Sequence, residues 1–260
     1  MATFFVPPYL GTGDADFFFG TGGSDVQIGL GGNDFFFAGE GNNFIIAGAG
    51  NDVAVSGGGS DVVVLEAGAD IAVTGGGNDI VLAGAGADIV LAEAGNDTVL
   101  GEGGNDTLDG GDGNDDVDGG AGNDTVLGGA GNDVALGGAG NDTVNGGAGN
   151  DEIAGGTGND DLTGGGGSDD FYWRIADLAP TEVDIVRDFN ANDRLRFEGD
   201  WNPPVNPTNI TVADFGLGTA AADTRITFAN GAQILLQDFS GALNLGTNVT
   251  ESTNPYTEIA

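Results

Sequence analysis

The nonapeptide GGAGNDTVL, residues 119–127, and its earlier counterpart GLGGNDFFF, residues 29–37, are built on one plan. Each opens with small or turn-forming residues, places Asn-Asp at positions five and six, and closes with three strand-forming residues. From Gly11 to Tyr172 the chain consists of eighteen such nonapeptides without insertion or deletion. Glycine holds position four and aspartate position six in seventeen copies each, the exceptions being Asp14 and Asn43. A period this strict indicates a repeat architecture in which each unit packs on its neighbours.

The two halves of the nonapeptide predict a turn followed by a short strand. Glycine at several of the first four positions permits positive φ, and positions seven to nine are mostly β-branched, aliphatic or aromatic. In a three-residue strand the middle side chain faces opposite to its neighbours, and this middle residue is apolar in every copy except that of Gln27. The row predicts the core. Turn, strand, turn, strand makes one coil of 18 residues, so we expect about nine coils and a roll about 40 Å long.

The composition restricts the classes of partner and of chemistry. Among 260 residues there are 41 acidic and five basic ones, a net charge of -36, and neither Cys nor His. Nucleic acid would be repelled by this charge, and zinc and copper lack their preferred ligands. Without His or Cys the usual nucleophile and base arrangements cannot form, so we expect no enzyme.

The turns carry a chemical problem that a cation would solve. Turns two repeats apart stack on each other, and carboxylates about 5 Å apart repel. Calcium between successive turns takes oxygen ligands from carboxylates and strained carbonyls. Two stacks of nine turns allow up to about 16 calcium ions, and residues 1–172 hold 29 acidic and no basic residues. The alternative, aspartates used only as turn residues without metal, leaves this charge uncompensated.

The pattern G-G-x-G-x-D-x-U-x resembles the RTX (repeats-in-toxin) calcium-binding nonapeptide. This resemblance implies an all-β fold, a right-handed parallel β-roll, whose turns bind calcium through the Asp of position six and backbone carbonyls. It is weakened where position two is not glycine, as at Thr12, Thr21, Leu30, Glu66, Glu93 and Glu102. Carried over by position, the implied carboxylate ligands are Asp16, Asp25, Asp34, Asp52, Asp61, Asp70, Asp79, Asp88, Asp97, Asp106, Asp115, Asp124, Asp133, Asp142, Asp151, Asp160 and Asp169.

The regions outside the repeats predict an arm and a cap. We expect an apolar N-terminal arm over residues 1–10, the roll over 11–172, and a C-terminal region over 173–260 that holds all five Arg residues. Residues 184–197 predict strand, turn, strand, and 224–237 predict a hairpin around Asn230-Gly231. We expect an antiparallel β cap that covers the last coil. The region is similar to that which follows RTX arrays in type I secretion substrates, which implies a secreted protein, extracellular or at the cell surface.

The outward positions seven and nine divide the roll in two. From repeat ten onward they are largely polar, whereas in repeats one to nine all eighteen are apolar, including Phe17, Phe19, Phe35 and Phe37. Together they would expose on the order of 1,000 Å², more than the usual largest patch of a monomer. We therefore expect a homo-oligomer or polymer, as a filament, surface layer or matrix. The alternatives are that the tail covers these faces, or that the protein is a secreted, calcium-dependent, membrane-interacting effector.

Overall fold

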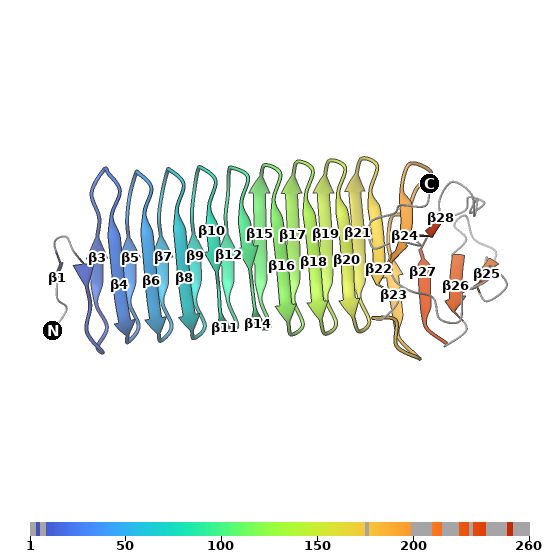
Figure 1. The fold of residues 1–260 in the computed structure, drawn as a ribbon, viewed down its shortest axis with the longest axis horizontal. Coiled ribbons are helices and arrows are strands. Elements are labelled where there is room, and N and C mark those ends of the chain that lie inside the picture. The colour runs from blue at the N-terminus through green and yellow to red at the C-terminus, as the bar shows by residue number, and fades with distance from the viewer. Residues whose placement is uncertain are drawn as a thin grey trace.

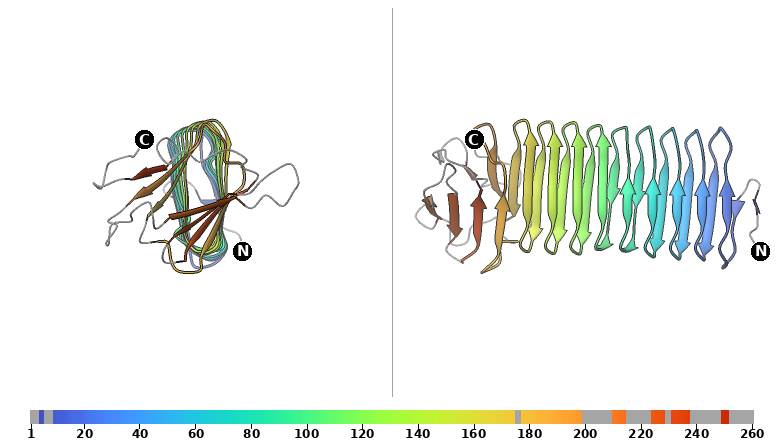
Figure 2. Two further views of the ribbon diagram at one scale, coloured as in Figure 1. Left: turned by 90° about the vertical axis from the view of Figure 1, so that its right-hand side faces the viewer. Right: turned by 180° about the vertical axis from the view of Figure 1, so that it is seen from behind.

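The chain forms one elongated roll of two parallel β-sheets. The computed structural model describes residues 4–5, 9–174, 177–198, 210–214, 224–228, 231–237 and 249–251. Figure 1 shows the strands side by side along the long axis, and the end-on view of Figure 2 shows the two sheets facing each other. The described residues contain no helix, and hence none that could cross a membrane. The predicted all-β roll of about nine coils is confirmed.

The odd-numbered repeats supply one sheet, called sheet A, and the even-numbered repeats supply the other, called sheet B. In spatial order sheet A consists of β1 (Phe4–Phe5), β3 (Phe17–Phe19), β5 (Phe35–Phe37), β7 (Val53–Val55), β9 (Ile71–Val73), β12 (Ile89–Leu91), β15 (Thr107–Asp112), β17 (Thr125–Ala130), β19 (Thr143–Ala148), β21 (Asp161–Gly166), β23 (Val183–Val186), β27 (Gln233–Leu236), β26 (Thr224–Phe228) and β25 (Ile210–Asp214). Sheet B consists of β2 (Tyr9–Leu10), β4 (Val26–Gly31), β6 (Phe44–Ala49), β8 (Val62–Ala67), β10 (Ile80–Leu82), β13 (Thr98–Leu100), β16 (Asp116–Ala121), β18 (Val134–Ala139), β20 (Glu152–Thr157), β22 (Asp170–Arg174), β24 (Arg194–Glu198) and β28 (Val249–Glu251), with the short β11 (Ala85–Gly86) and β14 (Gly103–Gly104) beside them.

The strands stack in strict register. Each strand of the roll pairs in parallel with the strand of the next coil, so that Phe17 lies beside Phe35 and Val126 beside Val144. Because no repeat is longer or shorter than nine residues, every position of the repeat forms its own row along the roll. The chemistry of a turn is therefore repeated from coil to coil.

The row of middle strand residues forms the core, as predicted. These side chains are fully or almost fully buried, Gln27 included, and the rings of Phe18 and Phe36 stack with centroids 4.6 Å apart. Position one adds a second buried row where it carries a side chain, as at Ala47 and Leu65. The sequence placed position one in the turn, and the structure shows that its side chain faces inward.

Both sheets continue past residue 172 before the cap begins. β23 pairs in parallel with β21, and β24 pairs in parallel with β22. The antiparallel part of the cap is the pair β26 and β27 together with β25, which confirms the expected hairpin. Of its turn the structure describes Gly231, which has a φ of 98° and so needs the freedom of glycine, whereas Asn230 lies outside the described residues.

Arginines of the added strands neutralise acidic residues on the outside of the last coils. Arg194 forms a two-pronged ion pair with Asp170, at 2.6 Å for each hydrogen bond, and Arg187 pairs with Asp161 in the same way. These pairs join the cap to the roll.

Candidate metal sites

The aspartates of position six form two buried ladders, one on each edge of the roll. The odd stack contains the turns of odd-numbered repeats, and the even stack those of even-numbered repeats. In each ladder the Oδ1 of one aspartate accepts a hydrogen bond from the backbone N–H of the aspartate one coil earlier. Asp106 N–H donates to Asp124 Oδ1 at 2.8 Å, and Asp124 N–H donates to Asp142 Oδ1 at 2.8 Å. One oxygen of each carboxylate is thereby held in place by the neighbouring coil.

The second oxygen, Oδ2, is buried and has no hydrogen-bond partner in fifteen of these aspartates. A buried carboxylate oxygen without a partner is costly, because it has lost its water and gained nothing in return. Most of these residues are only 1–2% exposed. They are Asp34, Asp52, Asp61, Asp70, Asp79, Asp88, Asp97, Asp106, Asp115, Asp124, Asp133, Asp142, Asp151, Asp160 and Asp169.

Asn43 reveals which atoms face this oxygen. Its Nδ2 donates to the carbonyl oxygens of Gly39 at 3.2 Å, Gly41 at 2.9 Å and Ser56 at 3.3 Å. These are positions two and four of its own turn and position one of the next coil. Since the repeats are in register, an aspartate Oδ2 at the same place faces carbonyl oxygens, which cannot donate a hydrogen bond. A cation among these oxygens would satisfy all of them.

In the turns where position one is glycine, the absence of a side chain there adds to this space. A Cβ added to Gly119, at position one, would lie 2.5 Å from the Gly137 carbonyl oxygen and 2.8 Å from Asp124 Oδ2. Both oxygens therefore face the same small volume. Gly120 and Gly122, at positions two and four, have φ values of 91° and 150°, which glycine adopts without strain.

The donor set fits calcium. It consists of one free carboxylate oxygen and several carbonyl oxygens, and hard cations such as calcium prefer oxygen ligands. No group of three or more His, Cys, Asp or Glu side chains that could hold a metal occurs in the described part of the chain, so a cation here depends on the backbone. Low ligand charge gives weak binding, in the range of extracellular calcium modules.

Burial raises the pKa of the fifteen aspartates with a free Oδ2 above the ordinary value. The pKa rises from 3.8 to about 7 at Asp70 and Asp142, and to about 6 at Asp34, Asp97 and Asp106. Desolvation is the largest cause, and the charges of neighbouring aspartates add to it. The backbone hydrogen bond to each carboxylate works in the opposite direction. An empty ladder therefore holds protons that a filled ladder would not.

Two of the predicted ligands have a different environment. The N–H and Oγ1 of Thr12 donate to Asp16 Oδ2 at 2.7 and 2.9 Å, and those of Thr21 donate to Asp25 Oδ2 at 2.5 and 3.1 Å. The other fifteen predicted aspartates have the free oxygen described above. That all seventeen bind calcium stays a prediction.

The structure adds two aspartates that the sequence did not reveal. Asp160 N–H donates to Asp184 Oδ1, and Asp169 N–H donates to Asp193 Oδ1, both at 3.1 Å. The two residues therefore continue the odd and the even ladder. Asp184 and Asp193 lie nine residues apart, which matches the period of the repeat. The step from Asp169 to Asp184 is longer than nine residues, so the period alone does not identify them.

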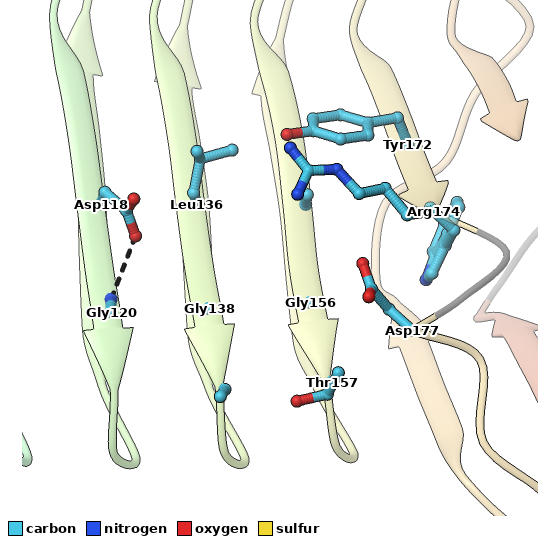
Figure 3. A pocket seen from close by; sticks show the side chains of 12 residues that line it. Asp118, Gly120, Leu136, Gly138, Gly156, Thr157, Tyr172, Arg174 and Asp177 are labelled. Atoms are coloured by element: carbon cyan, nitrogen blue, oxygen red, sulfur yellow. Dashed lines mark hydrogen bonds between the residues drawn. The ribbon is translucent and has the colours of Figure 1, made fainter. Parts of the chain in front are cut away.

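A separate groove of about 360 Å³ opens on sheet B beside the cap (Figure 3). Tyr172, Arg174 and Asp177 line its cap side, and Asp118 lies across it, with Oδ1 accepting a hydrogen bond from Gly120 N–H at 3.0 Å. Burial raises the pKa of Asp118. Its lining residues include no His, Cys or Ser, the side chains that most often act as base or nucleophile. We assign no reaction to it.

Comparison with known proteins supports the calcium interpretation of the ladders. The family model for the RTX calcium-binding nonapeptide repeat, which holds four copies of the repeat, matches residues 10–45, 28–63, 64–99, 91–126, 100–135, 118–153 and 136–171. These matches together span more than half of the chain. A search of curated proteins gave no match.

Two solved structures are similar to parts of the chain. One is the solution structure of the AlgE6R3 subunit of the mannuronan C5-epimerase from Azotobacter vinelandii, with 28% identity over 49% of this chain and 77% of that one, at a TM-score of 0.38. The other is the crystal structure of the extracellular lipase LipA from Serratia marcescens, with 16% identity, covering 92% of this chain and 40% of that one, at a TM-score of 0.28.

Proposed function

Because the chain belongs to the RTX calcium-binding nonapeptide repeat family, we propose that it is a secreted structural protein that folds on calcium and then self-assembles. The observation that carries the calcium part is the set of fifteen buried, partnerless aspartate oxygens. RTX repeats are typical of secreted extracellular proteins, where calcium is abundant. Because calcium binds the folded ladders and not the dispersed chain, its binding free energy adds to the stability of the roll.

The apolar outer faces of repeats one to nine support self-assembly. In the structure their outward side chains are exposed or half-buried. On sheet A the Phe17, Phe19 and Phe37 side chains are 41%, 47% and 47% exposed, and on sheet B Val26 is 50% exposed. No described residue covers them. Together the two faces present on the order of 1,000 Å² of apolar surface, more than the largest patch of a usual monomer. A partner in a stable interface buries about 800 Å².

A second copy of this chain is the occupant that fits these faces best. Two rolls have the same strand spacing, so rows of side chains on one can mesh with those on another along the whole apolar half. The two faces lie on opposite sides of the roll (Figure 2), so each molecule can contact two neighbours. Such contacts continue into a filament or layer. Residues 1–172 contain no Lys or Arg to attract anionic lipid, which favours a second copy over a membrane.

Size-exclusion chromatography with light scattering, with calcium and with chelator, tests this proposal. We expect assemblies in calcium and an expanded monomer in chelator. Phe37→Ser should weaken the assembly, whereas Leu127→Ser, at the same repeat position in the polar half, should leave it unchanged. A calcium-loaded wild-type monomer at micromolar concentration would contradict assembly. Calcium-dependent leakage of neutral liposomes by that monomer would instead favour the membrane-interacting effector.

A further inference from the structure

The two aspartate ladders do not run unchanged from one end of the roll to the other. In most turns the Oδ2 atom of the position-six aspartate has no hydrogen-bond partner. At the ends of both ladders, and at one position inside the even stack, hydrogen-bond donors of the chain itself occupy the corresponding space. Five positions are affected, and they differ in sequence from one another. What they share is a donor group aimed at the oxygens that a cation would otherwise bind.

The first turn of each stack is closed by a threonine at position two. The amide and hydroxyl of Thr12 donate to Asp16 Oδ2, and those of Thr21 donate to Asp25 Oδ2, with all four distances between 2.5 and 3.1 Å. Position two has positive φ in most later turns, and neither threonine does. The change of residue therefore coincides with a change of backbone that brings two donors to the carboxylate.

The last turn of each stack is closed by a donor from the cap. The indole Nε1 of Trp173 donates to Asp184 Oδ2 at 2.7 Å, and the backbone N–H of Asn190 donates to Asp193 Oδ2 at 2.8 Å. Trp173 is only 2% exposed, so its indole is fixed in place by packing. Asp184 and Asp193, which the sequence did not assign to the ladders, thus each have a hydrogen-bond donor at Oδ2.

Asn43 interrupts the even stack from within. Its Oδ1 keeps the ladder hydrogen bond with Asp25 N–H at 2.9 Å, while its Nδ2 donates to three carbonyl oxygens. The amide thereby meets the hydrogen-bonding needs of this turn without a carboxylate charge. A cation would have to displace the amide and would gain no anionic ligand.

We propose that these five positions bind no calcium, because the chain's own donors take the place of the ion. The inference rests on the proposed calcium function. The fifteen positions left to calcium form two runs, eight from Asp34 to Asp160 in the odd stack and seven from Asp61 to Asp169 in the even stack. Beside Asp61 and Asp79 the hydroxyls of Ser56 and Thr74 each donate to one position-one carbonyl oxygen at 3.1 Å, but the carboxylate is present and its Oδ2 has no partner, so these two positions stay in the run. The first two coils, residues 11–46, need a single ion, at Asp34.

Native mass spectrometry tests the inference by counting the calcium ions on each chain of the full-length protein. The wild type is expected to saturate at fifteen ions. Asn43→Asp restores a carboxylate among the same three carbonyl oxygens and should bind one ion more. Thr21→Gly removes the hydroxyl and restores the usual residue of position two, and it should also gain one ion. Asn42→Asp is the matched control: it adds the same charge in the same turn at an exposed position and should leave the count unchanged.

The outcomes separate the inference from the function on which it rests. More than fifteen ions on the wild type would place calcium at one or more of the five positions and overturn the inference. The inference is also overturned if Asn43→Asp and Thr21→Gly each bind the same number of calcium ions as the wild type. A wild-type chain that binds no calcium overturns the proposed function itself.

Discussion

Replacing one ladder aspartate by asparagine should have opposite effects with and without calcium. Asp106 lies in the middle of the odd stack, where its Oδ1 accepts the N–H of Asp88 at 2.8 Å and its Oδ2 has no partner. In Asp106→Asn the amide oxygen can keep the ladder bond. By analogy with Asn43, its Nδ2 would donate to the carbonyl oxygens of Glu102, Gly104 and Gly119.

The magnitudes follow from the contacts. Three new hydrogen bonds at about 1 kcal/mol each should stabilise the calcium-free roll by roughly 2–3 kcal/mol. The variant loses one ion, worth about 2.7 kcal/mol when calcium is a hundredfold above its dissociation constant. In calcium the two effects nearly cancel, so Asp106→Asn should unfold close to the wild type. Asp106→Ala loses the ion and gains no hydrogen bond, and it should be less stable than Asp106→Asn by roughly 2–3 kcal/mol.

Urea unfolding followed by circular dichroism in saturating calcium gives the free energies, and a calcium titration gives the folding midpoint. Asp106→Asn should fold at a lower calcium concentration than the wild type. Asp109→Asn, which removes the same charge outside the ladder, should change the free energy of unfolding by less than about 0.5 kcal/mol. Equal stability of the Asn and Ala variants in calcium would contradict hydrogen bonding by the amide, and an unchanged ion count in Asp106→Asn would contradict calcium binding at this position.

Three further predictions concern pH, the cap and backbone strain. Because burial raises the pKa of Asp70 and Asp142 from 3.8 to about 7, the calcium-free roll binds protons that the unfolded chain releases. The stability of the calcium-free roll should be greatest below about pH 4 and be lost as pH rises through 6 to 7. In chelator, acidification should therefore restore the sheet signal in circular dichroism. A sheet signal that falls on acidification would contradict this. Trp173→Phe leaves Asp184 Oδ2 without its donor and removes buried ring area, and it should lower the free energy of urea unfolding by about 1–3 kcal/mol. The loss should be smaller in an Asp184→Asn background, where only the packing cost remains. Glu66 has a φ of 74°, a left-handed conformation that strains a residue with a side chain. Glu66→Gly should therefore raise the free energy of urea unfolding by about 1 kcal/mol. A decrease of about 1 kcal/mol would contradict strain at this turn.

The sequence predicted the repeat architecture and most of the candidate ligands because the period is strict. With no insertion over eighteen repeats, like residues must stack on like. The inward row around Val126 and the ladder around Asp124 follow from that alone. Even the apolar outer faces could be read from residues such as Phe37, because the parity of a short strand fixes which side chains point outward.

What the sequence did not predict depends on contacts between segments far apart in the chain or on local backbone choice. Asp184 and Asp193 join the ladders only because the chain returns to the same two sheets after a longer connection. The donor role of Trp173 toward Asp184 requires that return to be known. At Thr12 and Thr21 the departure from glycine was visible, but the donors it brings to the carboxylates depend on the backbone conformation of the turn.

The calcium dependence of the fold itself is tested most directly by far-ultraviolet circular dichroism of the wild-type chain at pH 7.5, first in chelator and then as calcium is added. Because fifteen buried carboxylate oxygens are left without partners, we expect little sheet signal in chelator and a cooperative gain as calcium rises toward millimolar concentration. A full sheet signal in chelator, unchanged by calcium, would contradict it.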